Sequence, residues 1–223
     1  MNHLAAMDSI DPSRRVQLVV DEWGTWFDVE PGTNPGFLYQ QSTMRDSIVA
    51  SLALNIFNKH ADRLMMANIA QTVNVLQSVI LTDGEKMVKT PTYYAFKMFK
   101  EHQNNTLLGS FLTTDTLISD NDGHREYPQL LESASIDEDG VIVATLVNTS
   151  LDKAAPIQCQ IADRKVASVK AEIITGDCRD KNEFDKAEAV SIQPFDGVTV
   201  DGDSIAFTVP ACSVLKLTIS CDA

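Results

Sequence analysis

The sequence predicts two structural parts in one chain of 223 residues: an α/β part over residues 1–103 and an all-β antiparallel sandwich over residues 104–223. Strand and helix patterns alternate up to Gln103, and beyond it helical periodicity gives way to short β-rich runs separated by turn residues. The charge changes at the same place. Residues 1–103 hold 9 basic and 11 acidic side chains, whereas residues 104–223 hold 9 and 20.

The first apolar run, residues 16–20 (VQLVV), follows the helix-stopping pair Asp11-Pro12 and is followed directly by charged and aromatic residues. A short, continuous apolar run of this kind is typical of a buried parallel strand. A long loop is expected over residues 28–42, which contain two prolines and two glycines. Long loops in compact domains are often functional.

A helix is predicted over residues 43–59, where apolar residues recur at helical spacing and Thr43 with Asp46 resembles a capping box. Residues 64–67 are interpreted as a second buried strand, and Thr90-Pro91 caps a final helix over residues 93–101. The order strand, helix, strand, helix implies parallel strands joined by helical crossovers. Because two strands cannot close a sheet or cover both of its faces, this part is expected to be incomplete.

The second part contains β-rich runs separated by turn signals such as Asp139-Gly140 and Asp201-Gly202-Asp203. The runs span residues 133–136, 141–147, 157–161, 166–174, 189–192, 204–209 and 214–220. Many short strands with turns between them predict an antiparallel sandwich.

Composition narrows the classes of partner and site. A net charge of −13 argues against nucleic acid and anionic membrane surfaces, and no apolar run approaches the roughly 18 residues of a membrane span. The four cysteines have no Cys-x-x-Cys spacing, so we predict no metal or other cofactor and interpret them as free thiols in preference to bridges. The first 15 residues lack the pattern of a secretory signal, which favours a cytoplasmic location.

The sharpest candidate site is the segment of residues 21–26 (DEWGTW), at the end of the first predicted strand. Two interpretations fit the residues. Asp21 and Glu22 could form an ordinary acidic turn flanked by core or rim tryptophans. Alternatively, polar side chains at the carboxyl end of a parallel barrel strand face an active site, which makes Glu22 a candidate catalytic carboxylate.

Two separate motifs resemble glycoside hydrolase family 51, the α-L-arabinofuranosidases. Residues 19–26 (VVDEWGTW) and 30–41 (EPGTNPGFLYQQ) are similar to the segment that bears the family's nucleophile. Residues 58–63 (NKHADR) and 67–75 (ANIAQTVNV) resemble its last barrel strand and the loop that follows. The motifs occur in the family's order, and the resemblance runs to about residue 103.

The resemblance implies a fold and a site. Residues 1–103 would be the last two βα units of a (β/α)8 TIM barrel, and residues 104–223 a jelly-roll-like sandwich. Glu22 would be the catalytic nucleophile on the seventh strand, Gln71 would contact the bound furanose, and Trp26 would line the site. The implied partner is an arabinose-containing oligosaccharide or polysaccharide such as arabinan or arabinoxylan, and the full-length protein would be a homo-oligomer.

The implied chemistry needs a second carboxyl group. A retaining glycosidase uses a nucleophile and an acid/base residue about 5 to 5.5 Å apart. The family's acid/base glutamate follows an asparagine upstream of the nucleophile, but no Asn-Glu pair precedes Glu22, and Asn182-Glu183 lies in the β-rich part. We therefore expect this chain to correspond to the C-terminal portion of an exo-acting enzyme and to be inactive alone. The alternative is a non-catalytic module for oligomer packing or glycan contact.

We also expect a hydrogen-bond donor, such as the Gln71 amide, to keep Glu22 ionised. Trp23 and Trp26 are expected to form an apolar wall against one face of the sugar.

Overall fold

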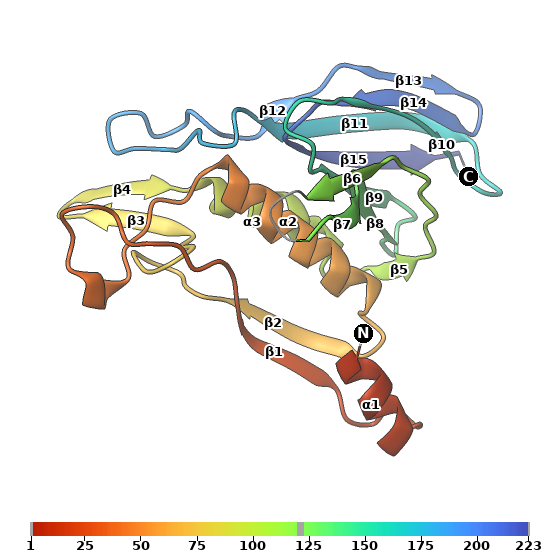
Figure 1. The fold of residues 1–223 in the computed structure, drawn as a ribbon. Helices are drawn as coiled ribbons and strands as arrows, with labels where there is room; N and C mark the ends of the chain where they lie inside the picture. The colour runs from red at the N-terminus through yellow and green to blue at the C-terminus, as the bar shows by residue number, and fades with distance from the viewer. Residues whose placement is uncertain (1, 120–122, 223) are drawn as a thin grey trace.

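A computed structural model describes residues 2–119 and 123–222, and it shows a mostly β protein arranged in layers (Figure 1). The central layer is a six-stranded antiparallel sheet in the order β12-β11-β15-β9-β8-β5. Two helices cover one face of this sheet, and a three-stranded sheet, β10-β14-β13, covers the other. A parallel pair, β1-β2, lies beyond the helices.

The longest connections follow β1, β2 and β11, and they span residues 24–43, which include η1, residues 70–79 and residues 176–192. The helical elements are α1 (Asn2–Ile10), η1 (Pro35–Phe37), α2 (Met44–Lys59), α3 (Pro91–Phe99) and η2 (Lys100–His102). The strands of the first part are β1 (Leu18–Trp23), β2 (Leu64–Ile69), β3 (Ile80–Asp83) and β4 (Lys86–Lys89). Those that follow are β5 (Thr106–Leu108), β6 (Thr116–Ser119), β7 (Arg125–Pro128), β8 (Leu130–Ile136), β9 (Ile142–Asn148), β10 (Ala155–Gln160), β11 (Val166–Thr175), β12 (Gln193–Pro194), β13 (Val198–Asp201), β14 (Ser204–Val209) and β15 (Ser213–Cys221).

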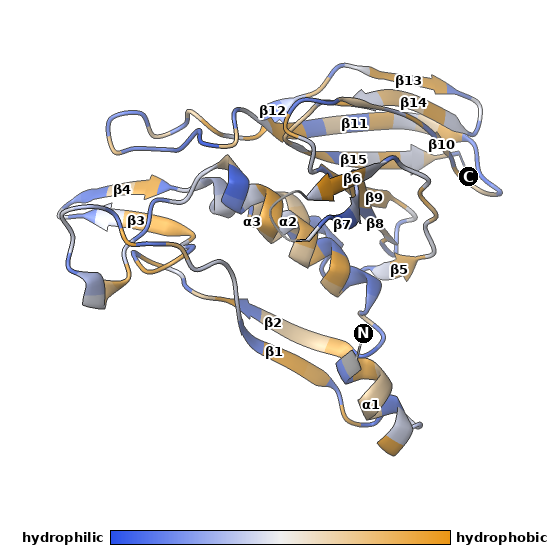
Figure 2. Ribbon diagram, in the orientation of Figure 1, coloured by the Kyte–Doolittle hydropathy of each residue, from blue (hydrophilic) through white to orange (hydrophobic). Residues whose placement is uncertain are grey.

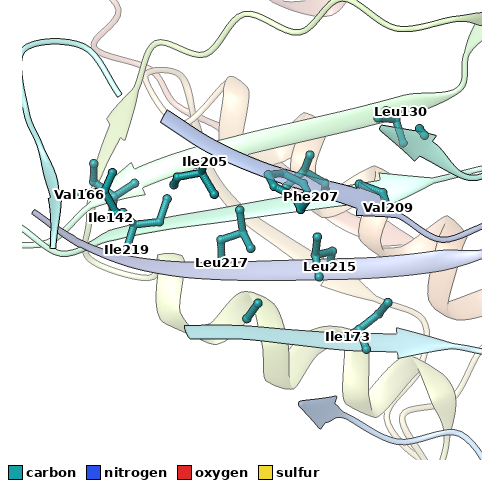
Figure 3. Close-up of a cluster of buried hydrophobic side chains, with 13 residues drawn as sticks. Leu130, Ile142, Val166, Ile173, Ile205, Phe207, Val209, Leu215, Leu217 and Ile219 are labelled. Carbon is teal, nitrogen blue, oxygen red and sulfur yellow. The ribbon is translucent and has the colours of Figure 1, made fainter. Parts of the chain in front are cut away.

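The core between the two sheets is built from alternate residues of the central strands (Figure 3). Ile173 of β11 and Leu215 of β15 point toward Ile205 and Phe207 of the smaller sheet. Successive side chains of a strand point to opposite faces, so each central strand supplies apolar residues to both sides of the sheet. This is why β9 and β15 are apolar along most of their length instead of alternating with polar residues.

The opposite face of the central sheet packs on the helices. Ile174 and Val214, each adjacent in sequence to a residue of the first core, contact a second buried cluster that contains Met44 of α2 and Met98 of α3. The helical layer and the sheet therefore share one apolar core. The helix α2 also binds the sheet through polar groups, since Asn55 accepts hydrogen bonds from hydroxyls of β8 and β9.

The strands β1 and β2 are paired in parallel, with Val20 opposite Ala67 and Trp23 opposite Ile69. From Val20 to Trp23 the chain advances three residues, whereas the paired segment of β2, from Ala67 to Ile69, advances two. The strand β1 therefore contains a bulge just before its carboxyl end. No closed barrel is formed by residues 2–119 and 123–222.

The structure confirms the predicted order of strand, helix, strand and helix, and Thr43 precedes the first residue of α2 as predicted. The first strand ends later than predicted, so Glu22 lies inside β1 and not in a turn after it. The β3-β4 hairpin was missed, although Asp83-Gly84 marks its turn and Gly84 adopts φ +56°. Residues 189–192 form no strand, because the buried Asn182 side chain holds the backbone of Val190 there.

The remaining expectations concern thiols and membranes. The four cysteines are unpaired, with Cys212 buried and the other three half-buried. Among the described residues, no helix is long and apolar enough to cross a membrane.

The strands β1 and β2 are coloured largely as hydrophobic, and no sheet or helix layer covers the side of the pair turned away from α2 and α3 (Figure 2). Val19 is 44% exposed and Met66 47%. Met65 of the same strand is 65% exposed. Large exposed apolar patches on soluble proteins mark surfaces that another element covers.

We expect the purified chain to bind a hydrophobic dye such as ANS through this face. Replacing Val19 by Thr and Met66 by Ser together should reduce the dye fluorescence, because both changes remove apolar surface without burying a polar group. The exposed Met87, replaced by Ser on the β4 strand, provides a control away from this pair. Dye binding unaffected by the double change would place the open apolar surface elsewhere.

Candidate active site

Glu22 lies near the carboxyl end of β1, within the bulge between Val20 and Trp23. Its side chain is exposed, on a strand whose neighbouring Trp23 points into the helical layer. Among the described residues, no hydrogen bond or ion pair engages the Glu22 carboxylate. The carboxylate is thus presented at a strand end with its acceptor oxygens open to solvent.

Gln71 follows the carboxyl end of β2, the strand beside β1. The two strand ends are tied together, because the backbone N–H of Ala70 donates to the carbonyl of Trp23 at 2.8 Å. Glu22 and Gln71 therefore lie at the carboxyl ends of two neighbouring parallel strands. Within the described residues no hydrogen bond joins the Gln71 amide to Glu22, so the expected support of the carboxylate by Gln71 stays a prediction.

Trp23 does not form the sugar-facing wall expected for it. Its indole packs edge-on against Phe57 of α2, with ring centroids 5.2 Å apart, and is stacked on Phe96 of α3 at 5.9 Å. Successive side chains of a strand point to opposite faces, so Glu22 and Trp23 lie on different sides of the pair. The bulge puts Trp23 on the same side as Val20, and Trp23 therefore belongs to the contact with the helices.

Trp26, three residues beyond β1, is available for binding. Its side chain is 69% exposed and borders a shallow hollow with Phe27, Asp28 and Pro35 of the long loop. The guanidinium of Arg45 lies 3.5 Å from the centroid of the Phe27 ring, a cation–π contact with one of the residues that line this hollow. An open aromatic surface suits the apolar face of a sugar.

Buried polar side chains hold the backbone on both sides of Trp26. The Thr25 N–H donates to Oε1 of Gln77 at 3.1 Å, and the Phe27 N–H donates to Oε1 of Gln40 at 2.9 Å. Both glutamines are almost completely buried. Sequence reasoning missed them, because a glutamine in a polar loop gives no signal of burial.

Asp46 joins this arrangement from the first turn of α2. Its Oδ1 accepts from the Thr25 hydroxyl at 3.0 Å, and its Oδ2 accepts from the Thr43 N–H at 2.7 Å. The sequence identified Asp46 only as a capping residue. The structure shows that the same carboxylate also reaches the segment after Glu22.

A loop of the second part supports the same helix end. The N–H groups of Met44 and Arg45 donate to the carbonyls of Asp180 and Cys178 at 2.8 and 2.9 Å. The first N–H groups of a helix have no partner within it, so these carbonyls satisfy donors that would otherwise be unpaired. The sandwich thereby helps to fix the position of α2. Because Asp46 of α2 is bonded to Thr25, it also helps to fix the position of the segment after Glu22.

Comparisons with known proteins show which family the chain resembles. A family profile described as "Alpha-L-arabinofuranosidase C-terminal domain" matches residues 21–213. An "Intracellular exo-alpha-L-arabinofuranosidase" of Bacteroides ovatus is 45% identical over 217 residues, which are 96% of this chain and 42% of the relative. An "Exo-alpha-(1->6)-L-arabinofuranosidase" of Bifidobacterium longum is 27% identical over 209 residues, 86% of this chain and 40% of the relative.

Solved structures show the same pattern of coverage. The GH51 arabinofuranosidase of Xanthomonas axonopodis pv. citri superposes with a TM-score of 0.93 at 41% identity, covering 98% of this chain and 44% of that one. The α-L-arabinofuranosidase of Thermotoga maritima, solved as an arabinose complex, has a TM-score of 0.81 at 22% identity, which shows a shared fold. The chain spans less than half the length of these relatives.

Proposed function

The chain belongs to the α-L-arabinofuranosidase C-terminal domain family, and from that premise we propose that it supplies the nucleophile, Glu22, of an exo-acting α-L-arabinofuranosidase. The observation that supports this most strongly is the exposed Glu22 carboxylate at the carboxyl end of a parallel strand, where barrel enzymes place catalytic groups. The relatives named above are arabinofuranosidases. The proposed substrates are terminal α-L-arabinofuranosyl groups of arabinan or arabinoxylan.

In the proposed mechanism the Glu22 carboxylate attacks the anomeric carbon and forms a covalent glycosyl-enzyme, which water then hydrolyses with retention of configuration. Trp26 provides an apolar surface for the sugar, and Gln71 contacts its hydroxyl groups. Protonation of the leaving oxygen requires a second carboxyl group about 5 to 5.5 Å from the nucleophile. Because no Asn-Glu pair precedes Glu22, that group would come from residues outside this chain.

The proposed architecture follows from the same premise. The strands β1 and β2 with the helices α2 and α3 correspond to the last two βα units of a (β/α)8 barrel, and the open apolar face of β1-β2 would lie in the barrel interior. We divide the chain into a barrel portion, residues 1–103, and a sandwich, residues 104–223. The full protein would act as a homo-oligomer, and the intracellular description of the Bacteroides relative favours a cytoplasmic location.

The test uses a chimera in which the portion of the Bacteroides ovatus relative that precedes the matched residues is joined to this chain. On an aryl α-L-arabinofuranoside we expect the chimera to be active and this chain alone to be at least about 10²-fold less active, since general acid catalysis contributes that much or more. Inactivity of a folded chimera would argue against the proposed function. Activity of the chain alone would show that it contains its own acid/base residue.

A non-catalytic role has one observation in its favour, namely the exposed apolar face of β1-β2, which suits packing against another element. The chimera separates the two functions. If the chain is a module that only packs or contacts glycan, the chimera should fold as one species but have no activity.

A further inference from the structure

The segment after Glu22 is held by three buried polar side chains, Gln40, Gln77 and Asp46, which we call the glutamine clamp. All three are at most 3% exposed, and they come from the long loop, the segment before β3 and the first turn of α2. A buried polar group is costly unless it is hydrogen-bonded, so such groups persist where their partners matter. Each of these side chains is bonded to residues 25–27.

The bonds of the clamp bracket Trp26. Gln77 binds the backbone N–H that precedes this residue, and Gln40 binds the one that follows it. The Nε2 of the same Gln77 amide donates to the carbonyl of Asp46 at 2.6 Å. Because a carbonyl oxygen can only accept, this bond fixes the orientation of the amide and turns Oε1 toward Thr25. The exposed indole of Trp26 therefore extends from a backbone that is anchored on both sides.

Gly24 provides the close approach that the clamp needs. It adopts φ +150°, and a Cβ built there would lie 3.2 Å from the carbonyl oxygen of Ala70 and 3.3 Å from Oε1 of Gln77. A side chain at this position would press the strand end away from the glutamine. Only Gly24 thus lies between the last residue of β1, Trp23, and the first residue held by the clamp, Thr25, and it is closely packed.

From this geometry we propose that Gln40, Gln77 and Asp46 are positioning residues for the active site. They hold Trp26 and the carboxyl end of the Glu22 strand in the arrangement that receives the furanose ring. The inference rests on the proposed function for its catalytic consequence, but the order of residues 25–27 is a property of this chain alone. A preorganised binding surface avoids the entropic cost of ordering these residues when the sugar binds. Small displacements of reacting groups also slow catalysis strongly.

The experiment begins with the 223-residue chain and three variants. Thr25→Val removes the hydroxyl that donates to Asp46 while keeping the shape of the side chain, and Thr25→Ser restores the hydroxyl. Gln77→Met removes both bonds of the amide at similar length. Gln103→Met makes the same chemical change at an exposed position and is the matched control.

Amide hydrogen exchange at Thr25 and Phe27 reports the order of the segment. We expect exchange to be at least about tenfold faster in Thr25→Val and Gln77→Met, to return toward wild type in Thr25→Ser, and to be unchanged in Gln103→Met. Unchanged exchange in Gln77→Met, with the protein folded, would overturn the proposal. This readout needs no activity, so it stands even if the proposed function fails.

The same variants in the chimera test the catalytic consequence. We expect kcat to fall by about 10- to 100-fold in Thr25→Val and Gln77→Met, with recovery in Thr25→Ser and wild-type values in Gln103→Met. If Glu22→Gln leaves the chimera active, the proposed function fails whatever the clamp does. If Glu22→Gln inactivates it but Gln77→Met keeps kcat within about twofold of wild type, the positioning role is overturned.

Discussion

Replacing Glu22 by Gln in the chimera is expected to lower kcat by about 10³-fold or more on an aryl α-L-arabinofuranoside. The amide has nearly the same shape as the carboxylate, but it cannot provide the anionic oxygen that forms the bond to the anomeric carbon. The open position of Glu22 on β1 means that the change leaves no buried partner unpaired, so folding should be preserved. Steady-state kinetics with a thermal melt of each protein separates the two effects.

Two further variants make the assignment specific. Asp21→Asn changes the neighbouring exposed carboxylate and is expected to keep kcat within a few-fold of wild type. In Glu22→Ala, the cavity left by the side chain admits azide, which can attack the anomeric carbon in place of the carboxylate. We expect azide to restore turnover and to yield an arabinofuranosyl azide of inverted configuration. A Glu22→Gln chimera with wild-type kcat would remove this residue from the reaction.

The order of the first elements could be predicted because local signals and tertiary structure agree there. The capping residue Thr43 and the pair Thr90-Pro91 mark real helix starts, and the apolar run that begins β1 is a real strand. The extent of β1 could not be predicted, because its last residues are polar and are kept in the strand by pairing with β2. Short edge strands such as β5 and β13 likewise depend on neighbours distant in sequence.

The candidate site was only partly predictable. Motifs predicted Glu22, Gln71 and Trp26 as site residues, and the structure places Glu22 and Gln71 at neighbouring strand ends. Trp23 was misassigned because a bulge cannot be recognised from residue types, and it reverses which face the next side chain occupies. Gln40 and Gln77 were not found because their role depends on being buried against residues 25–27, which is a tertiary property.

A buried histidine at the junction of helices and sheet makes a second strong prediction. Nδ1 of His102 is 2.8 Å from the Ser135 hydroxyl, and Nε2 is 3.0 Å from the hydroxyl of Thr145. The Thr145 hydroxyl donates its proton to Asn55, so it accepts from Nε2–H, and Nδ1 is the acceptor of the Ser135 hydroxyl. The network is therefore satisfied by the neutral ring.

The pKa of His102 is lowered from 6.5 to about 4, chiefly by burial of the ring; Glu101 opposes the shift and Lys216 adds to it. A histidine with a lowered pKa contributes stability above the unfolded pKa, and this is lost as the pH falls from about 6.5 toward the folded value. The shift corresponds to about 3 kcal/mol of unfolding free energy lost between pH 7 and pH 4. Urea titrations at pH 7 and pH 4 measure this loss of unfolding free energy. We expect it to be larger in wild type than in His102→Gln, whose side chain cannot titrate. His3→Gln, on the exposed α1, should behave as wild type. Equal acid sensitivity of wild type and His102→Gln would mean that protonation of this ring does not control the junction.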